Sequence, residues 1–388
     1  MPVPPGLQHL SPWAARLCLR VEDFTRSLMP WPGAAKSSMR EGSGSRAGPA
    51  GTLPPVLVLA VSGGLDSTAL AVILKLLSSR LHLRLTAAHL DHRLRPESGE
   101  DAACCASFCA ELGLPYVCAA LDVRALSQTW NTGIEDAGRQ ARHAWLEKTR
   151  EEDGAFAVAM GHHLDDLAED QLMRLTRGGG WPALGGMPAW DEDRRILRPL
   201  LMTPKSDLRR LLDELGVTWR EDSSNADPAF TRNRVRRDML PLFVRENPDY
   251  LCACAERWRQ ARLDELHWDE AVSAILDSSP DDAMRSGADC PSGASCLAGA
   301  GPRFLSNESL VSCSPALRLR LYKRVIESLG PGQPLSAAMH GLDDAWKKRG
   351  TGKRFQFPGG KEARVERGGI RFHPGPLPPG VDTSRGEG

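Results

Sequence analysis

Short apolar runs alternate with helix-length segments between residues 56 and 176, and this pattern constrains the fold more than any other feature of the sequence. Strands are expected at residues 56–61, 83–90, 116–121 and 155–161, and helices at residues 68–79, 98–112, 134–150 and 165–176. Consecutive strands joined by helices pair in parallel, and the helices cover both faces of the sheet. We therefore predict an α/β domain with a parallel, Rossmann-like sheet whose ligands bind beyond the carboxyl ends of the strands.

The segments before and after this α/β region differ from it in composition. Residues 1–52 are rich in Pro, Gly, Ser and Ala, and we expect a partly disordered N-terminal extension with one amphipathic helix over residues 12–28. An Arg-containing leader of this kind can also resemble a transit peptide, but Glu22 and Asp23 fall inside the helix and favour a plain extension. The α/β domain is expected to span residues 53–243, followed by a helical linker region at 244–277.

The rest of the chain is expected to form a small basic domain. Residues 278–303 are rich in Ser, Gly, Ala, Pro and Asp and are predicted to be a flexible insertion, and residues 376–388 a tail. Between them, residues 304–375 are predicted to be a small α+β region, with helices at 317–328 and 336–349 and strands at 355–357 and 363–372. Residues 318–371 hold 13 Lys or Arg against 5 Asp or Glu, which suits an anionic partner.

Composition excludes some other classes of protein. No apolar run approaches the roughly 18 residues that a membrane helix needs, so a membrane protein is not expected. The ten cysteines include no CxxC pair, which argues against a zinc knuckle or a thioredoxin-like motif. The sequence shows no secretory signal, so we expect reduced thiols in a cytoplasmic protein. The 49 basic and 49 acidic side chains balance, so the net charge indicates no partner.

A glycine-containing loop follows the first predicted strand, at residues 60–70, AVSGGLDSTAL. Gly63 and Gly64 let the backbone approach an anion, and the following helix offers unpaired N–H groups at its N-terminus. Asp66 would repel a bare phosphate, so its presence is explained by a magnesium ion between it and a nucleotide. The loop matches neither GxxxxGK[ST] nor GxGxxG. A tight turn capped by Asp66 is the structural alternative.

Four further sequence segments, which we call strings, contain candidate catalytic or binding residues: HLDHRLRPESGEDA at 89–102, AGRQARHAWL at 137–146, GHHLDDLAEDQLMRLTRGGG at 161–180 and EDSSNADPAFTRNRVRRDMLP at 221–241. In the third string, three acids lie beside His162 and His163 where a helix begins, which suits either capping or the handling of magnesium and pyrophosphate: Asp165, Asp166 and Glu169. Arg139 and Arg142 share one helical face that is either solvated or aimed at phosphates.

The last string places four guanidinium groups within six residues: Arg232, Arg234, Arg236 and Arg237. Such a charge run is either a solvated helix face or a surface for a phosphate backbone, in which case binding would weaken steeply with salt. In the C-terminal region, Trp346, Phe355 and Phe357 offer either rings for unpaired bases or the core of the small domain.

The string SGGLDS resembles the pyrophosphate loop of the PP-loop ATP pyrophosphatases, which form adenylated intermediates. Together with the other four strings, it resembles the tRNA(Ile)-lysidine synthetase family over residues 56–243, and the last string is the most specific. His143 departs from the family pattern, which more often has an aromatic residue after the second arginine. The C-terminal basic stretch resembles the substrate-recognition domain of the family more weakly.

The resemblance implies the fold, the reaction and the site. It implies a PP-loop ATP pyrophosphatase domain that adenylates the wobble cytidine in the CAU anticodon of an isoleucine tRNA and joins free lysine to it, with ATP as substrate and Mg²⁺ as cofactor. No membrane partner is implied, and a homodimer stays open. ATP would be bound by Ser62, Gly63, Gly64, Leu65, Asp66, Ser67 and His89. Catalysis would involve Asp66, Arg139, Arg142 and Asp166, with Asp66 and Asp166 as metal ligands. The tRNA would contact Arg232, Arg234, Arg236, Arg237, Lys353 and Arg354.

Two other functions are compatible with parts of this pattern. A tRNA thiolase on the same scaffold, for example one that makes 2-thiocytidine, commonly uses a CxxC pair, and the spacing of Cys104, Cys105 and Cys109 does not provide one. A non-catalytic nucleotide-sensing RNA-binding protein would not need Asp66 together with an acidic helix start. The ligase is therefore the favoured prediction.

Overall fold

The computed structural model describes residues 3–28, 54–93, 98–220, 231–278 and 302–375. The chain forms two compact units, Met1–Ala261 and Arg262–Gly388. Within the described ranges, no helix is long and apolar enough to cross a membrane. The flexible insertion and the tail predicted from composition fall almost entirely outside these ranges.

The first unit contains a six-stranded sheet in the order β3-β2-β1-β4-β6-β5. Its strands are β1 (Val56–Ala60), β2 (Arg84–Asp91), β3 (Tyr116–Ala120), β4 (Ala157–Ala159), β5 (Trp190–Asp191) and β6 (Ile196–Leu197). All pairs are parallel except β5 with β6. The predicted parallel sheet is therefore confirmed. Strands β5 and β6 add a short antiparallel pair that was not predicted, because a strand of two residues is too short to show an alternating sequence pattern.

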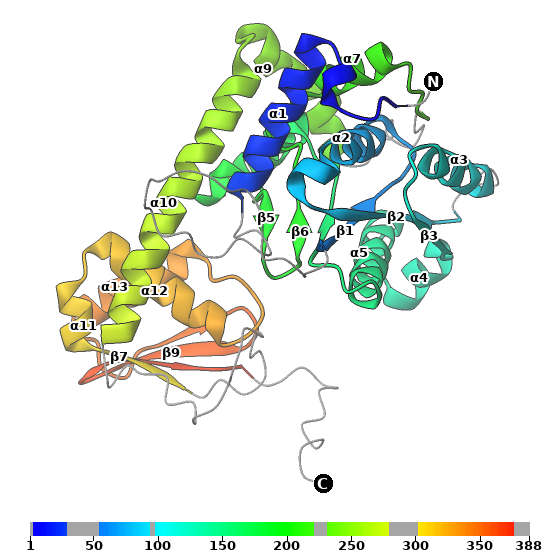
Figure 1. Ribbon diagram of the computed structural model, residues 1–388. Helices are drawn as coiled ribbons and strands as arrows, with labels where there is room; N and C mark the ends of the chain where they lie inside the picture. Colours follow the sequence, from blue (N-terminus) through cyan, green and yellow to red (C-terminus); the bar gives the residue numbers. More distant parts are fainter. Residues whose placement is uncertain (1–2, 29–53, 94–97, 221–230, 279–301, 376–388) are drawn as a thin grey trace. The chain divides into compact units, whose positions relative to one another are not determined.

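Helices cover both faces of this sheet (Figure 1). Alternate residues of β1 point into two cores: Leu57 and Leu59 into one, and Val56 and Val58 into the other. The first core is closed by α1 (Pro12–Ser27), α2 (Leu65–Leu81), α3 (Ser98–Glu111) and α7 (Lys205–Leu215). The second is closed by α5 (Ile134–Glu152), against which α4 (Val123–Trp130) packs. Helix α6 (Leu164–Thr176) follows β4.

Helix α1 confirms the predicted helix in the N-terminal region, and it belongs to the core of the first unit. Ser11 caps its N-terminus by accepting a hydrogen bond from the Ala14 amide at 3.2 Å. Leu17 is 1% exposed and packs in the main core. Glu22 is buried between Arg80, at 2.6 Å, and Arg26, at 2.9 Å. An amphipathic face and a paired acid thus fix the helix to α2.

The last part of the first unit is helical, as predicted. It contains α8 (Thr231–Arg234), a π-helical turn η4 (Val235–Met239), α9 (Leu240–Glu246) and the start of α10 (Tyr250–Ser278). Because the boundary between the two units falls within α10, this long helix contributes residues to both of them.

The second unit is built on an antiparallel sheet in the order β7-β10-β9-β8. The strands are β7 (Arg303–Ser306), β8 (Arg354–Phe357), β9 (Lys361–Glu366) and β10 (Gly369–His373), and the helices are α11 (Asn307–Ser312), α12 (Pro315–Ser328) and α13 (Ser336–Lys347). The single strand predicted over residues 363–372 is two strands joined by a turn at Arg367 and Gly368. Phe357 is buried in the core, and Phe355 packs against that core from a half-buried position.

Candidate functional site

The phosphate loop predicted after the first strand lies between β1 and α2. Gly63 has a φ of 80°, a conformation that favours glycine, and a Cβ there would lie 3.1 Å from the sulfur of Cys105. The Ser67 hydroxyl accepts a hydrogen bond from the Ser62 amide at 3.0 Å and donates one to the Gly64 carbonyl at 3.1 Å. The loop is thereby braced from within, and the N-terminus of α2 is left to meet an anion.

The loop after β4 approaches the phosphate loop closely. A Cβ on Gly161 would lie 2.8 Å from the Asp66 carbonyl oxygen, so only glycine permits this approach. The two residues that follow, His162 and His163, are consequently held beside Asp66.

His163 is the centre of a cluster of carboxylates. Its ring nitrogens lie 3.4 Å from Asp66, 3.5 Å from Asp165 and 3.4 Å from Asp166. Burial alone would lower the pKa of His163, but Asp166, Asp165 and Asp66 together raise it to about 9. His163 is therefore a buried cation near neutral pH, and its contacts are longer than good hydrogen bonds.

Lys205 joins this cluster from α7, although no sequence pattern singled it out. Its Nζ lies 3.4 Å from Asp66, and its backbone N–H donates to Oδ2 of Asp165 at 2.9 Å. Burial raises the pKa of Asp66, but His163 and Lys205 outweigh it and keep that pKa below its ordinary value. The only sequence signal was its place directly after Pro204, where a helix begins.

The other two acids of α6 are held by arginines from the C-terminal part of the unit. Arg232 lies 2.9 Å from both Asp166 and Glu169, and Arg236 lies 3.0 Å from Asp166. Asp166 is 6% exposed and Glu169 is 1% exposed. Burial raises the pKa of Asp166, but His163 and Arg232 hold it well below its usual range. Asp166 is therefore ionised inside the protein, and both carboxylates are paired with arginines.

The four arginines predicted to form one tRNA surface thus divide into two pairs. Arg232 and Arg236 point inward to α6. Arg234 and Arg237 are exposed, and Arg237 pairs with Asp238 at 2.8 Å. The π-helical turn adds one residue per turn and so rotates the side chains that follow it relative to an α-helix. Asp166 and Glu169 of α6 then attract Arg232 and Arg236 inward. A helix face shared by all four arginines does not exist in the structure.

The residues present suit a magnesium ion at Asp66 better than at Asp166. Oδ1 of Asp66 is buried and accepts no hydrogen bond from any described residue. Oδ1 of Asp166 already lies against two arginines, and its Oδ2 accepts from the His163 amide at 3.1 Å. Within the described ranges, no group of three or more His, Cys, Asp or Glu residues could hold a metal. One carboxylate plus nucleotide phosphates is a usual ligand set for magnesium.

A second group of cations lies at the same edge of the sheet. Arg139 and Arg142 lie on α5, and Arg198 follows β6. Arg198 is 6% exposed, and its Nη1 donates to the Pro188 carbonyl at 2.7 Å. The pKa of His162 falls to about 3, first because of its burial and then because of nearby arginines, so its ring is neutral. Burial lowers the pKa of Arg142 and of Arg198, and Arg139 is close enough to lower both further. Such a group of guanidiniums is suited to anionic groups.

His89 lies at the end of β2, beside the phosphate loop. Its Nδ1 lies 2.9 Å from the Val61 carbonyl oxygen, which can only accept, so Nδ1 carries the proton. Its Nε2 is buried without a hydrogen-bond partner among the described residues. The predicted position of His89 next to the nucleotide loop agrees with this placement.

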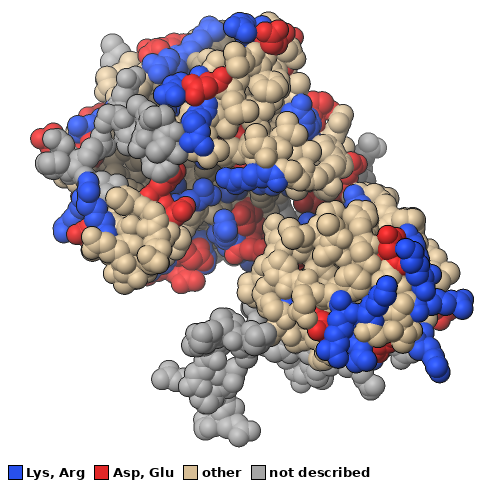
Figure 2. Space-filling model, turned by 180° about the vertical axis from the view of Figure 1, so that it is seen from behind, with Lys and Arg blue, Asp and Glu red and all other residues tan. Residues whose placement is uncertain are grey.

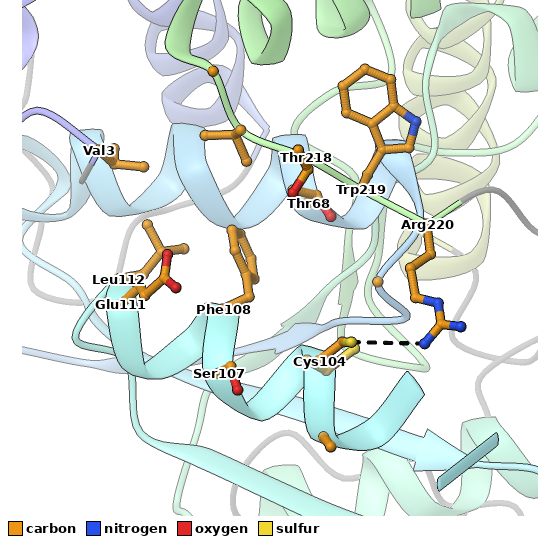
Figure 3. Close-up of a pocket in the computed structure, with 15 residues that line it drawn as sticks. Val3, Thr68, Cys104, Ser107, Phe108, Glu111, Leu112, Thr218, Trp219 and Arg220 are labelled. Atoms are coloured by element: carbon orange, nitrogen blue, oxygen red, sulfur yellow. Dashed lines mark hydrogen bonds between the residues drawn. The ribbon is translucent and has the colours of Figure 1, made fainter. Parts of the chain in front are cut away.

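A cavity of about 610 Å³ lies on the α3 side of the phosphate loop (Figure 3). Phe108, Trp219 and Arg220 are among its walls. The Arg220 amide donates to the Gly63 carbonyl at 2.9 Å, and its Nη1 lies 2.8 Å from Asp101. Of the predicted site residues, only Gly63 lines this cavity. The charged side chains described above gather around Asp66 instead.

Comparison with known proteins agrees with this geometry. A family model described as a PP-loop domain matches residues 52–243. The tRNA(Ile)-lysidine synthase of Nitratidesulfovibrio vulgaris is 44% identical over 326 residues, which are 84% of this chain and 93% of that protein. The chain belongs to the tRNA(Ile)-lysidine synthase family.

Two further members of the family are longer than this chain. The synthase of Geobacter sulfurreducens is 36% identical over 70% of this chain and 54% of its own length. The synthase of Thermus thermophilus is 33% identical over 84% of this chain and 59% of its own length. The similarity thus includes most of the present chain but little more than half of these relatives.

Proposed function

We propose that this protein joins lysine to the wobble cytidine of an isoleucine tRNA with a CAU anticodon, and cleaves ATP to AMP and pyrophosphate. The observation that carries the proposal is the meeting of three elements at Asp66: the phosphate loop, the acidic start of α6, and Lys205 of α7. The family membership supplies the substrates by analogy.

The reaction has two steps that the site can support. The 2-oxygen of the cytidine attacks the α-phosphorus of ATP, and pyrophosphate leaves. The ε-amine of lysine then attacks carbon 2 of the cytidine, and AMP leaves. No protein side chain needs to form a covalent bond, so the protein acts by positioning groups and by stabilising the negative charge that develops on the leaving groups.

The residues around the phosphate loop have different roles in binding ATP and in stabilising charge. The N-terminus of α2 and the hydroxyl of Ser62 bind phosphate oxygens, while the hydroxyl of Ser67 holds the loop in shape. Asp66 would hold magnesium, which would offset phosphate charge. Lys205 and His163 fix Asp66. The remaining cations stabilise the departing pyrophosphate: Arg139, Arg142 and Arg198. The inward pair, Arg232 and Arg236, forms ion pairs with Asp166 and Glu169 of α6.

The tRNA contacts fall on exposed cations. In the first unit these are Arg234 and Arg237. In the second unit, Figure 2 shows Lys and Arg side chains gathered on one side, and the exposed cations of that unit include Lys347, Lys348, Arg349, Lys353 and Arg354. Contacts of this kind neutralise backbone phosphates, so binding weakens as salt rises. ATP, free lysine and tRNA occur together in the cytoplasm, where we place the reaction.

The test is direct. The purified protein is incubated with ATP, magnesium, labelled lysine and a transcript of the isoleucine tRNA, and the digested RNA is analysed by mass. Lysine on the wobble cytidine is expected, and a methionine tRNA with the same anticodon letters should not be modified. AMP release without lysine transfer would point to a different acceptor, such as sulfur in a thiolase. Absence of ATP cleavage in a folded, RNA-binding sample would contradict both enzymatic functions.

A further inference from the structure

A partly exposed tryptophan stands over a hollow at the end of α6 that the reaction does not use. Trp181 follows three consecutive glycines and is 40% exposed. The hollow beside it, which we term the Trp181 hollow, has a volume of about 480 Å³. It is lined by Trp181, Leu184, Ala253, Glu256, Arg257 and Gln260. All of these residues belong to the first unit.

The segment that carries Trp181 is fixed before any ligand arrives. Side chains of α6 and α10 hold its backbone: Gln171 donates to the Gly185 carbonyl at 2.9 Å, Arg174 to Ala183 at 3.1 Å, and Trp258 to Met187 at 2.9 Å. Arg257 donates in turn to Gln171 at 2.6 Å. Binding at a prepared surface loses little conformational entropy, because the segment is already ordered.

The walls of the hollow match the chemistry of a nucleobase. The indole ring and the side chains of Leu184 and Ala253 offer apolar contact to the faces of a flat ring. Gln260 is exposed on α10 and can accept or donate hydrogen bonds at the polar edge of that ring. Glu256, also exposed, can accept them, and it already accepts one from Arg259 at 3.2 Å. Unpaired bases of RNA are commonly bound by this combination of aromatic stacking and polar side chains.

The hollow lies where one RNA molecule could contact both it and the cluster of charged residues around Asp66. The acids of α6 lie at its N-terminal end and the Trp181 segment follows its C-terminal end, and a helix of 13 residues is about 20 Å long. At about 3.4 Å per stacked nucleotide, this distance corresponds to about six nucleotides. A base in the hollow is therefore about six nucleotides away from the reacting nucleotide.

We propose that the Trp181 hollow binds one unpaired base of the RNA substrate by stacking it on Trp181. The identity of the RNA as a tRNA rests on the proposed function. Binding here would help to set which nucleotide reaches Asp66, because a base held at a fixed distance from Asp66 fixes the register of the RNA.

The first test compares three variants of the full chain. Trp181→Ala should raise the Kd and the KM for the isoleucine tRNA by about 5- to 150-fold and leave the KM for ATP unchanged, because one stacked base is lost. Trp181→Phe keeps an aromatic face and should recover most of the affinity. Trp130→Ala is the matched control, since Trp130 is 42% exposed on α4, away from the hollow. Equal tRNA affinities for Trp181→Ala and Trp130→Ala would overturn the proposal.

A second measurement identifies the base and separates this proposal from the function. Abasic nucleotides replace, one at a time, the bases up to about six nucleotides on either side of the wobble cytidine, and each RNA is bound to wild type and to Trp181→Ala. At one position the two losses should not add, because the same contact has been removed twice. Additive losses at every position would overturn the site even if lysidine forms. A non-additive position in a protein that forms no lysidine would support the site while the proposed function failed.

Discussion

Both units bury arginines against carboxylates, but the two clusters differ in how completely their polar atoms are paired. In the second unit, Asp343 lies 2.7 Å from both Arg318 and Lys347 and accepts from the Tyr322 hydroxyl at 3.1 Å. Arg318 also donates to the Cys313 carbonyl at 2.7 Å. This cluster is closed, because its donors and acceptors meet at short distances.

The cluster in the first unit is open by comparison. The contacts of His163 with its three acids are 3.4–3.5 Å long, and Oδ1 of Asp66 accepts no hydrogen bond from any described residue. A buried carboxylate oxygen without a donor is costly for the folded state. We infer that the closed cluster around Asp343 stabilises the second unit, whereas the open cluster around Asp66 keeps a carboxylate oxygen available for a ligand.

Replacing the open carboxylate should give the largest effect. Asp66→Asn keeps the shape of the side chain and removes its charge, so kcat for lysidine formation should fall by about 100- to 1000-fold, as when one preorganised electrostatic group is removed. The melting temperature should fall modestly, because the substitution removes the carboxylate charge that His163 and Lys205 face. Rates of AMP release measure the effect. An unchanged rate would mean that Asp66 has no part in catalysis. The open cluster would then not differ from the closed one in function.

The closed cluster should respond in the opposite way. Asp343→Asn leaves Arg318 buried without its counter-ion and should lower the free energy of unfolding of the second unit by about 3 kcal/mol. Hydrogen exchange of α12 and α13, followed by mass spectrometry, measures this loss locally. Asp344→Asn is the control, since Asp344 is exposed one residue away. Equal protection in the two variants would show that the closed cluster does not stabilise the unit.

Lys205 should contribute less than Asp66, because it acts through that carboxylate. Lys205→Met should lower kcat/KM for ATP by about tenfold, which corresponds to about 1.4 kcal/mol. Lys205→Arg should restore part of the loss by keeping the charge. Lys75→Met is the matched control, since Lys75 lies on α2 and donates to the Gly113 carbonyl. Equal kinetics for the Lys205→Met and Lys75→Met variants would exclude Lys205 from the site.

The smallest effect should appear in the pH dependence of stability. Burial raises the pKa of Asp343, but Arg318 and Lys347 outweigh it and lower that pKa from its ordinary value of 3.8. The ionised group therefore stabilises the fold fully above about pH 3.8, and this stabilisation is lost as the pH falls through the lower folded-state pKa. The stability difference between wild type and Asp343→Asn should be constant near neutral pH and shrink in acid. A difference independent of pH down to full protonation would contradict the assignment.

The sequence by itself determined the parallel sheet, the phosphate loop and the acidic start of α6. These features are local: strand-length apolar runs alternate with helices, two glycines follow a strand, and acids occupy the first turn of a helix. It also predicted α1 as a helix, because its amphipathic period is local as well.

Only the tertiary structure decided which distant side chains meet. Lys205 reaches Asp66 across 139 positions of sequence, and Arg232 reaches Asp166 across 66. A run of four arginines has the same appearance whether it faces solvent or a buried acid, so the inward turn of Arg232 and Arg236 could not be predicted from spacing. Pairing between remote charges depends on how helices pack, and no periodicity within a single element records it.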